Sequence, residues 1–133
     1  MAVITRKNRF HGHNSMRYTY QHGKTIHGSY CALKYTPNSK RTTYRAAVVV
    51  SKKISKSAIV RNRIRRRIYE TVRNNIVSNQ AYDLIFTVFS DRLADIPAEE
   101  LREAVIDKLR TANIGLKLST VGSVRGIVDQ KEK

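Results

Sequence analysis

The stretch Ser51–Arg73, SKKISKSAIVRNRIRRRIYETVR, carries two superimposed patterns. Nine of its 23 residues are Lys or Arg, yet apolar residues recur at every fourth position, at Val60, Ile64, Ile68, Val72 and, just beyond, Ile76. On a helix of 3.6 residues per turn, residues four apart form one slowly drifting apolar stripe. The spacing therefore predicts a helix with one side packed on a core and another side studded with guanidinium groups.

The positive charge between Arg61 and Arg73 comes entirely from arginine. A guanidinium group is a planar fork that can donate to two phosphate oxygens at once. Only one acid, Glu70, lies in the whole stretch, whereas an exposed helix face normally alternates charges of both signs. The pattern favours a polyanionic ligand over a merely solvated basic face.

The charge of the chain is unevenly distributed. Residues 1–75 contain 18 Lys and Arg and a single acid, a balance of +17, whereas residues 76–133 contain 8 basic and 9 acidic residues, a balance of −1. Six of the ten acids lie between Asp91 and Asp107. A field of this kind attracts nucleic-acid backbones by releasing their condensed counterions. The first half is therefore the predicted contact surface.

Several classes of protein are disfavoured by simple features of the sequence. A length of 133 residues suits one domain. No apolar run approaches the roughly 18 residues of a membrane span, and the first residues lack the apolar core of a signal peptide, so we expect a cytoplasmic protein. The single cysteine, Cys31, is predicted to be a buried thiol, and the four histidines lack thiolate partners at zinc-finger spacing.

Hydrophobic patterns along the chain predict an α+β domain. The predicted elements are a helix from about Asn14 to Gly23, a strand over Thr25–Tyr35 broken or bulged at Gly28, a strand over Tyr44–Ser51, the basic helix, a strand over Tyr82–Phe89 and a helix over Ala98–Ala112. The first two strands are expected to form a hairpin, and the two most apolar strands, 44–51 and 82–89, are expected to be central. Because a long helix joins those two, they should be parallel.

The residues give no sign of catalysis by the chain alone. The basic half lacks a carboxylate pair, a glycine-rich phosphate loop and a nucleophile beside a base, so we predict neither catalytic residues nor metal ligands. His22 and His27 could meet in a turn, but they are more simply explained as covering a helix end or touching phosphate.

A specific combination of residues resembles the signature of the bacterial ribonuclease P protein component. It consists of Val50-Ser51-Lys52-Lys53, then Ala58, then Arg61-Asn62-Arg63-Ile64-Arg65-Arg66, with Glu70 following, and the resemblance extends from about Arg9 to Ala112. The chain departs from the family at Arg67, usually apolar, at Tyr69, often arginine, and in its first helix, where Met16 and Tyr20 replace an aromatic pair.

This resemblance implies a fold. We expect a single small domain over residues 1–112, with an about four-stranded mixed sheet packed with three helices in the order αβββαβα. The resemblance also implies a left-handed βαβ crossover, although such connections are right-handed in about 98% of cases. Residues 1–8 are expected to be a mobile basic arm, and the tail 113–133 receives no predicted structure.

The resemblance also implies a function. In the family, a catalytic RNA cleaves precursor tRNA to produce its mature 5′ end, using Mg2+ held mainly by the RNA and no organic cofactor. The protein binds that RNA and the single-stranded 5′ leader of the substrate. The residues expected to bind the catalytic RNA are Lys52, Lys53, Arg61, Asn62, Arg63, Arg65 and Arg66.

The leader cleft is expected between the first helix and the sheet. A groove for unpaired RNA needs cations that follow the phosphates and aromatic faces on which bases stack. The candidates are Met16, Arg17, Tyr20, Tyr30, Lys34 and Tyr35. The irregularity at Gly28 leaves open whether Tyr30 or Tyr35 faces the cleft.

Two other functions share these features. A ribosomal or other structural RNA-binding protein would have the same size and charge. A metal-dependent nuclease that acts without RNA is the third hypothesis. Cleavage of precursor tRNA that requires a catalytic RNA separates the first interpretation from both.

Overall fold

A computed structural model describes residues 13–77 and 79–117 of the chain. The elements follow in the order α1 (His13–His22), β1 (Lys24–Ile26), β2 (Cys31–Pro37), β3 (Arg45–Val49), α2 (Ala58–Asn75), β4 (Tyr82–Val88), the 3-10 helix η2 (Asp91–Ala94) and α3 (Ala98–Thr111). The predicted α+β class and the order αβββαβα are confirmed. The predicted basic arm and the tail beyond residue 117 lie outside the described residues.

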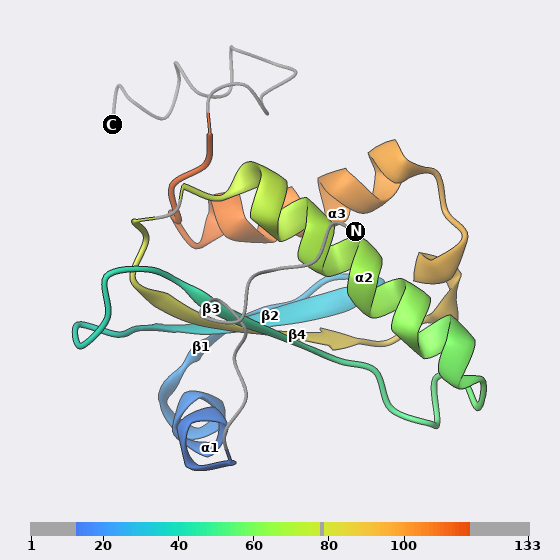
Figure 1. Ribbon diagram of the computed structural model, residues 1–133, viewed down its shortest axis with the longest axis horizontal. Helices are drawn as coiled ribbons and strands as arrows, with labels where there is room; N and C mark the ends of the chain where they lie inside the picture. Colours follow the sequence, from blue (N-terminus) through green and yellow to red (C-terminus); the bar gives the residue numbers. More distant parts are fainter. Residues whose placement is uncertain (1–12, 78, 118–133) are drawn as a thin grey trace.

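The four strands form one mixed sheet in the order β1-β2-β4-β3 (Figure 1). Strand β4 is central, as predicted, because it pairs antiparallel with β2 and parallel with β3. Helix α2 connects the parallel pair β3 and β4, which confirms the predicted crossover. Its left-handed sense stays a prediction from the resemblance.

The expected position of β3 is wrong. Strand β3 lies at an edge of the sheet, and no hairpin joins it to β2 because β4 separates the two. The sequence of β3 is apolar because helices cover this strand on both faces of the sheet. Ala46 and Val48 belong to the core beneath α2, while Ala47 is buried in a smaller cluster with Met16 of α1.

The single strand predicted over residues 25–35 is in fact a pair of strands. Strands β1 and β2 are antiparallel, with Ile26 opposite Leu33, so the chain reverses between them. Gly28 lies in this turn, where an added Cβ would collide with the side chain of Lys108 and come within 2.8 Å of the Cys31 carbonyl oxygen. The predicted break at Gly28 is therefore confirmed, in the form of a tight turn against α3, and the alternative of a bulge is wrong.

The two faces of the sheet carry different layers. Helix α1 covers one face, and α2 and α3 cover the other (Figure 1). Because side chains alternate along a strand, Leu84 and Phe86 of β4 enter the main core on the α2 and α3 side, and Asp83 and Ile85 lie on the α1 side. The side of α2 that faces the core carries Ile64, Ile68 and Val72, all fully buried as the fourfold spacing predicts.

Helix α2 begins later than the basic stretch does. Residues 51–57 form turns, and the Ser57 side chain caps the helix by accepting from the Val60 backbone N–H at 3.2 Å. Along the helix, the Tyr69 hydroxyl accepts the backbone N–H of Val48 in the edge strand β3 at 3.2 Å. The Tyr69 hydroxyl thus satisfies a backbone N–H of the edge strand that an added strand could otherwise bond.

Helix α3 ends in a turn with a left-handed residue. Asn113 has φ 63°, its N–H donates to Arg110 O, and the N–H of Ile114 donates to Leu109 O, each at 3.0 Å. This pair of bonds is a Schellman motif, with asparagine where glycine is commonest. Ile114 is then buried and Leu116 bridges to Ile76, so the packed unit continues past residue 112.

Candidate nucleic-acid interface

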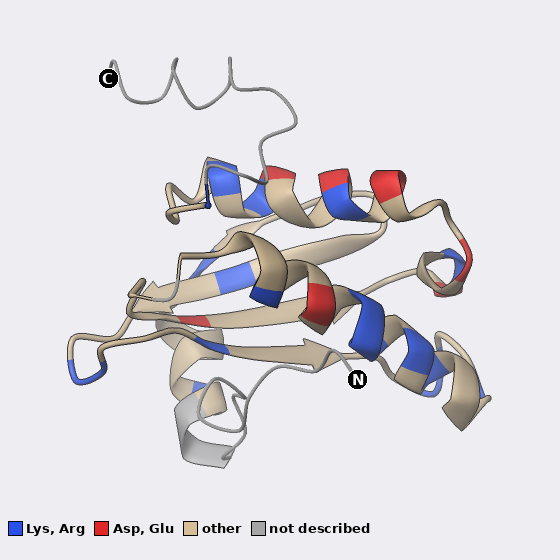
Figure 2. Cartoon of the chain, turned by 45° about the horizontal axis from the view of Figure 1, so that its top comes forward, with Lys and Arg blue, Asp and Glu red and all other residues tan. Residues whose placement is uncertain are grey.

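The outer face of α2 carries the exposed residues of the predicted RNA-binding set. Asn62, Arg63 and Arg66 are exposed, together with Ile59 one turn earlier and Glu70 one turn later. Arg61 and Arg65, at the edges of this face, are partly exposed. Figure 2 shows mainly basic segments along α2, whereas α3 carries both acidic and basic segments.

The arginines of this face are not neutralised by any carboxylate among the described residues. Arg61 donates to the Ser55 carbonyl at 2.9 Å, and Arg65 donates to the Asn62 side-chain oxygen at 2.7 Å. Across residues 13–77 and 79–117, no arginine of α2 forms an ion pair with a carboxylate. Their charge is therefore available to an external anion.

Two lysines extend the positive surface toward the sheet. Lys52 and Lys53 are both exposed in the turns between β3 and α2, directly before the first turn of the helix. The N-terminus of a helix also presents backbone N–H groups and the positive end of its dipole. This end of α2 thus combines side-chain and backbone attraction for phosphate.

Arg67, which lay outside the predicted RNA-binding set, has an internal role. Its Nη1 donates to the Leu93 carbonyl and its Nη2 donates to the Ile96 carbonyl, each at 2.7 Å. The two acceptors belong to one short segment, since Leu93 lies in η2 and Ile96 lies in the connection from η2 to α3. Arg67 therefore ties α2 to that segment.

The structure brings four of the six predicted cleft residues together on the α1 side. Met16 packs against the cluster of Ala47 and Ile85. Lys34 donates from Nζ to the Tyr20 carbonyl at 2.9 Å, and its Nζ lies 6.0 Å from the centroid of the Tyr20 ring. Tyr20 is 42% exposed and Arg17, three residues earlier, is exposed as well. We give the surface formed by Met16, Arg17, Tyr20 and Lys34, where the leader cleft is predicted, the name α1 groove.

The other two predicted cleft residues, Tyr30 and Tyr35, lie on the opposite face of the sheet. Tyr35 is opposite Leu84 in the ladder and packs on the main core, with its ring centroid 6.3 Å from that of Tyr82. The Tyr30 hydroxyl donates to Glu100 of α3 at 2.6 Å, and this hydrogen bond raises the pKa of Tyr30. Neither tyrosine reaches the α1 groove.

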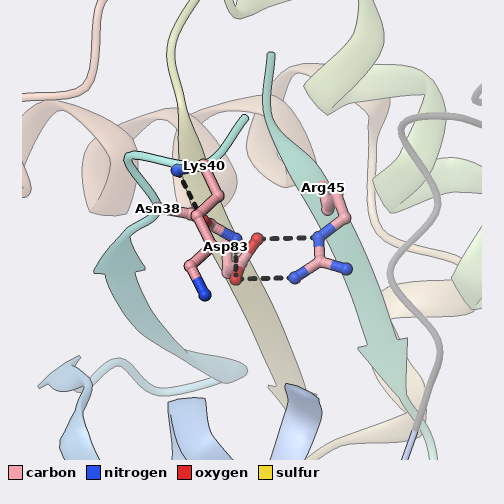
Figure 3. Close-up of polar contacts among 4 residues, drawn as sticks. All are labelled: Asn38, Lys40, Arg45 and Asp83. Carbon is pink, nitrogen blue, oxygen red and sulfur yellow. Dashed lines mark hydrogen bonds and ion pairs between the residues drawn. The ribbon is translucent and has the colours of Figure 1, made fainter. Parts of the chain in front are cut away.

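A cavity on the α1 side was missed by the sequence-based interpretation. It encloses about 380 Å³ and is lined by Tyr18, Pro37, Asn38, Ser39, Lys40, Arg45 and Asp83. Figure 3 shows its polar wall, in which Arg45 donates from Nε and Nη2 to the two carboxylate oxygens of Asp83, each at 2.9 Å. The signal available in the sequence is that Arg45 and Asp83, of opposite charge, each stand second in one of the two predicted parallel strands.

The remaining single residues behave more simply. Cys31 is fully buried, as predicted, and burial raises the pKa of its thiol. His22 stacks on Tyr18 and contacts the Tyr18 carbonyl at 3.2 Å, whereas His27 is exposed.

No three His, Cys, Asp or Glu residues gather as a metal site within the part of the chain that the structure describes. In the same part, every helix is too short or too polar to cross a membrane.

Comparison with known proteins gives a consistent result. The sequence model of the family described as Ribonuclease P matches residues 4–113. The ribonuclease P protein component of Clostridium botulinum is 31% identical over 111 residues, which cover 82% of this chain and 97% of that protein. The component from Chloroflexus aurantiacus is 34% identical over 93 residues, covering 69% of this chain and 67% of that protein.

Solved structures show the same fold at lower sequence identity. The RNase P protein of Staphylococcus aureus superimposes with a TM-score of 0.69 at 20% identity, covering 80% of this chain and 96% of that one. The RNase P protein of Thermotoga maritima gives a TM-score of 0.68, also at 20% identity, over 77% of this chain and 96% of that one.

Proposed function

This chain belongs to the ribonuclease P protein family, and from that premise we propose that its two exposed surfaces bind two different RNAs. As a ribonuclease P protein component, it is a subunit of a ribonucleoprotein endoribonuclease that matures the 5′ ends of tRNAs. The proposal assigns the catalytic RNA to α2 and the precursor tRNA to the α1 groove. Its place of action is the cytoplasm, where bacterial transcripts are processed.

The catalytic RNA is assigned to the outer face of α2. Arg63, Arg66 and Asn62 project from this face, and none of the α2 arginines forms an ion pair with a carboxylate within the described ranges. The flanking members of the set, Arg61 and Arg65, together with Lys52 and Lys53, extend the positive surface toward the sheet. A row of forks at helical spacing suits phosphates on a folded RNA.

The 5′ leader of the precursor is assigned to the α1 groove. Tyr20 and Met16 offer surfaces against which an unpaired base can lie, and each base stacked on an aromatic ring contributes about 1–3 kcal/mol. Arg17 and Lys34 supply the charge that follows a phosphate backbone. Tyr30 and Tyr35 are left out of the proposed groove because their side chains lie on the α2 and α3 side.

The chemical step is assigned to the RNA partner. The described residues do not fit a magnesium site, since they contain no cluster of metal ligands and the buried carboxylate of Asp83 is bonded to Arg45 and Asn38. Magnesium ions held mainly by the RNA would activate the attacking water. The protein's cations reduce the repulsion between the two RNAs, so that they associate at lower magnesium concentration.

The observation that carries this proposal is the row of arginines on α2 that lack acidic partners in the described chain. The test is cleavage of precursor tRNA in magnesium by the chain alone, by the matching catalytic RNA alone and by both together. We expect no cleavage by the chain alone and faster cleavage at low magnesium with both. Cleavage by the chain alone would indicate a protein nuclease, and an RNA reaction indifferent to the chain would indicate another RNA-binding role.

A further inference from the structure

We propose that the cavity between α1 and the loop after β2 binds one unpaired nucleotide of RNA, with its base against Tyr18 and its phosphate at Lys40. The inference rests on the proposed function, because it adds a nucleotide site to a chain that already handles single-stranded RNA. It concerns a different place from the α1 groove.

The cavity and the α1 groove lie on opposite flanks of α1. Tyr18 lines the cavity, whereas Tyr20 contacts Lys34 in the groove. Two residues along an α-helix are about 200° apart around its axis, so the two tyrosines project to different sides. The helix itself rests on the sheet through Met16 and the fully buried Thr19. RNA in the groove would thus leave the cavity open.

Tyr18 offers a ring against which a base can stack. The side chain is 54% exposed even though the ring of His22 stacks on it, with centroids 4.3 Å apart and planes inclined by 25°. His22 also contacts the Tyr18 carbonyl at 3.2 Å, which helps to fix this pair on the last turn of α1. A positioned and exposed aromatic ring is what sequence-tolerant binding of unpaired bases requires.

The polar wall of the cavity is organised so that its acid does not repel a phosphate. Both carboxylate oxygens of Asp83 accept from Arg45 at 2.9 Å, and one of them also accepts from the Asn38 side chain at 3.0 Å. The oxygen of that Asn38 amide accepts the backbone N–H of Lys40 at 3.1 Å (Figure 3). The partly buried ion pair therefore fixes the loop that presents the exposed Lys40 ammonium.

The size and charge of the cavity fit a nucleotide. A volume of about 380 Å³ is in the range of small-ligand sites. Its charged side chains, Lys40, Arg45 and Asp83, sum to one positive charge, which suits one phosphodiester. An aromatic ring on one wall and an ammonium group on another match a base and its phosphate.

The direct test is an NMR titration of the full chain with three probes: adenosine 5′-monophosphate, adenosine and ribose 5-phosphate. We expect the monophosphate to shift the signals of Tyr18 and of residues 38–40 together. Adenosine should shift chiefly Tyr18, and ribose 5-phosphate chiefly Lys40. Shifts confined to Tyr20, Lys34 and the α2 arginines, with the cavity signals unmoved, would overturn the proposal.

Two separate substitutions keep the proposal testable even if one of the variants fails to fold. Tyr18→Leu removes the ring and should weaken monophosphate binding about fivefold or more, the lower end of the contribution of one stacked base. Lys40→Gln removes the charge and should also weaken monophosphate binding. Arg102→Gln is the matched control, because it removes one partly exposed charge from α3 on the far face of the sheet. Equal affinities for all four proteins would overturn the proposal.

The same preparation separates this inference from the proposed function. Cleavage of precursor tRNA with the catalytic RNA is measured alongside the titration. If the parent chain stimulates cleavage while the cavity signals stay unmoved, only the nucleotide site is refuted. If the chain fails to stimulate cleavage, the proposed function is refuted, and cavity shifts with the monophosphate would still support the site.

Discussion

Arg66 and Arg67 are neighbours in the chain, but their guanidinium groups have different surroundings. Arg66 is exposed on the outer face of α2, whereas Arg67 donates two 2.7 Å hydrogen bonds, one to the carbonyl of Leu93 in η2 and one to that of Ile96 after it. A hydrogen bond from a charged group contributes roughly 1.5–3 kcal/mol to stability, more than a neutral one. One arginine is thus available to a ligand, and the other is part of the fold.

Replacing Arg67 should destabilise the protein. In Arg67→Met the apolar stem is retained, but the carbonyls of Leu93 and Ile96 lose their donor. We expect the free energy of unfolding to fall by about 1.5–3 kcal/mol, measured by urea denaturation. The control, Arg66→Met, should change stability by less than about 0.5 kcal/mol. Similar unfolding midpoints for the two variants would contradict the assigned role of Arg67.

Replacing Arg63 should weaken binding to the catalytic RNA. Arg63→Ala removes an exposed cation of the outer α2 face that has no carboxylate partner within the described residues. If Arg63 contacts one phosphate, affinity falls and the slope of log affinity against log salt decreases by about 1. Filter binding across a salt series measures both, and Arg102→Ala on α3 serves as the control. A slope unchanged from that of the parent protein argues against the contact.

The buried Tyr44 should make the protein less stable at alkaline pH. Burial raises the pKa of Tyr44 from 10.0 to about 12, against the opposing effect of Arg73. Because the folded pKa is the higher one, the stabilisation is complete below pH 10 and is lost as the pH rises through 12.

Comparison with Tyr44→Phe isolates that effect, since every other titration is shared by the two proteins. The unfolding free energy of the parent protein should decline relative to the variant between pH 10 and pH 12. Urea denaturation at several pH values measures the difference. A difference that stays constant over this range would show that Tyr44 ionises equally in the folded and unfolded chains.

At the scale of the elements, the end of α3 depends on one residue with a left-handed conformation. Asn113 at φ 63° allows the two bonds that close the helix and turns the chain so that Ile114 is buried. A β-branched residue tolerates this conformation poorly, so Asn113→Val should lower the unfolding free energy by about 1–2 kcal/mol. Asn113→Gly should match the parent protein or exceed it slightly. Thermal denaturation distinguishes the variants, and equal losses for both would implicate the asparagine side chain instead.

The sequence predicts an element well where one periodic pattern governs it. The fourfold spacing in α2 correctly gives the buried stripe of Ile64, Ile68 and Val72, and the apolar run after Tyr82 correctly gives the central strand β4. Strand β3 is equally apolar but lies at the edge. Burial on both faces depends on the covering helices, whereas the position within the sheet depends on pairing, which the side-chain pattern does not encode.

The candidate site was predictable to a similar extent. The arginines of α2 carry a positional signal, because their phase relative to the apolar stripe fixes which of them is exposed. The tyrosines carry no such positional signal. Tyr35 shares the face of Cys31 in β2 and therefore faces the main core. Tyr30 precedes the strand and donates a hydrogen bond to Glu100, 70 residues later. Such a contact between distant segments cannot be seen in the local sequence.

At the scale of the whole molecule, the packed unit includes the segment that follows α3. Ile114 is buried, the Val77 N–H donates to the Gly115 carbonyl at 3.0 Å, and the Lys117 N–H donates to the Asn75 carbonyl at 2.7 Å. These contacts hold the C-terminal end of α2 in place. Residues 113–117 thus belong with the domain that the resemblance placed at 1–112.

Shortening the chain tests that support. A chain that stops after residue 112 loses the burial of Ile114, which alone contributes about 1.5–3 kcal/mol. A chain that stops after residue 117 keeps it and is the control. We expect the shorter chain to unfold at lower urea concentration, and equal midpoints would mean that residues 113–117 add nothing to the fold.

The hydrogen bond of the Tyr69 hydroxyl bears on self-association of the protein before it binds RNA. By accepting the Val48 N–H, it occupies one donor on the outer side of β3, where a second copy could otherwise add a strand. We expect this contact to reduce strand-to-strand association between copies that have not yet bound RNA. Tyr69→Phe would keep the ring but lose that protection, so its solutions should become turbid sooner at high protein concentration.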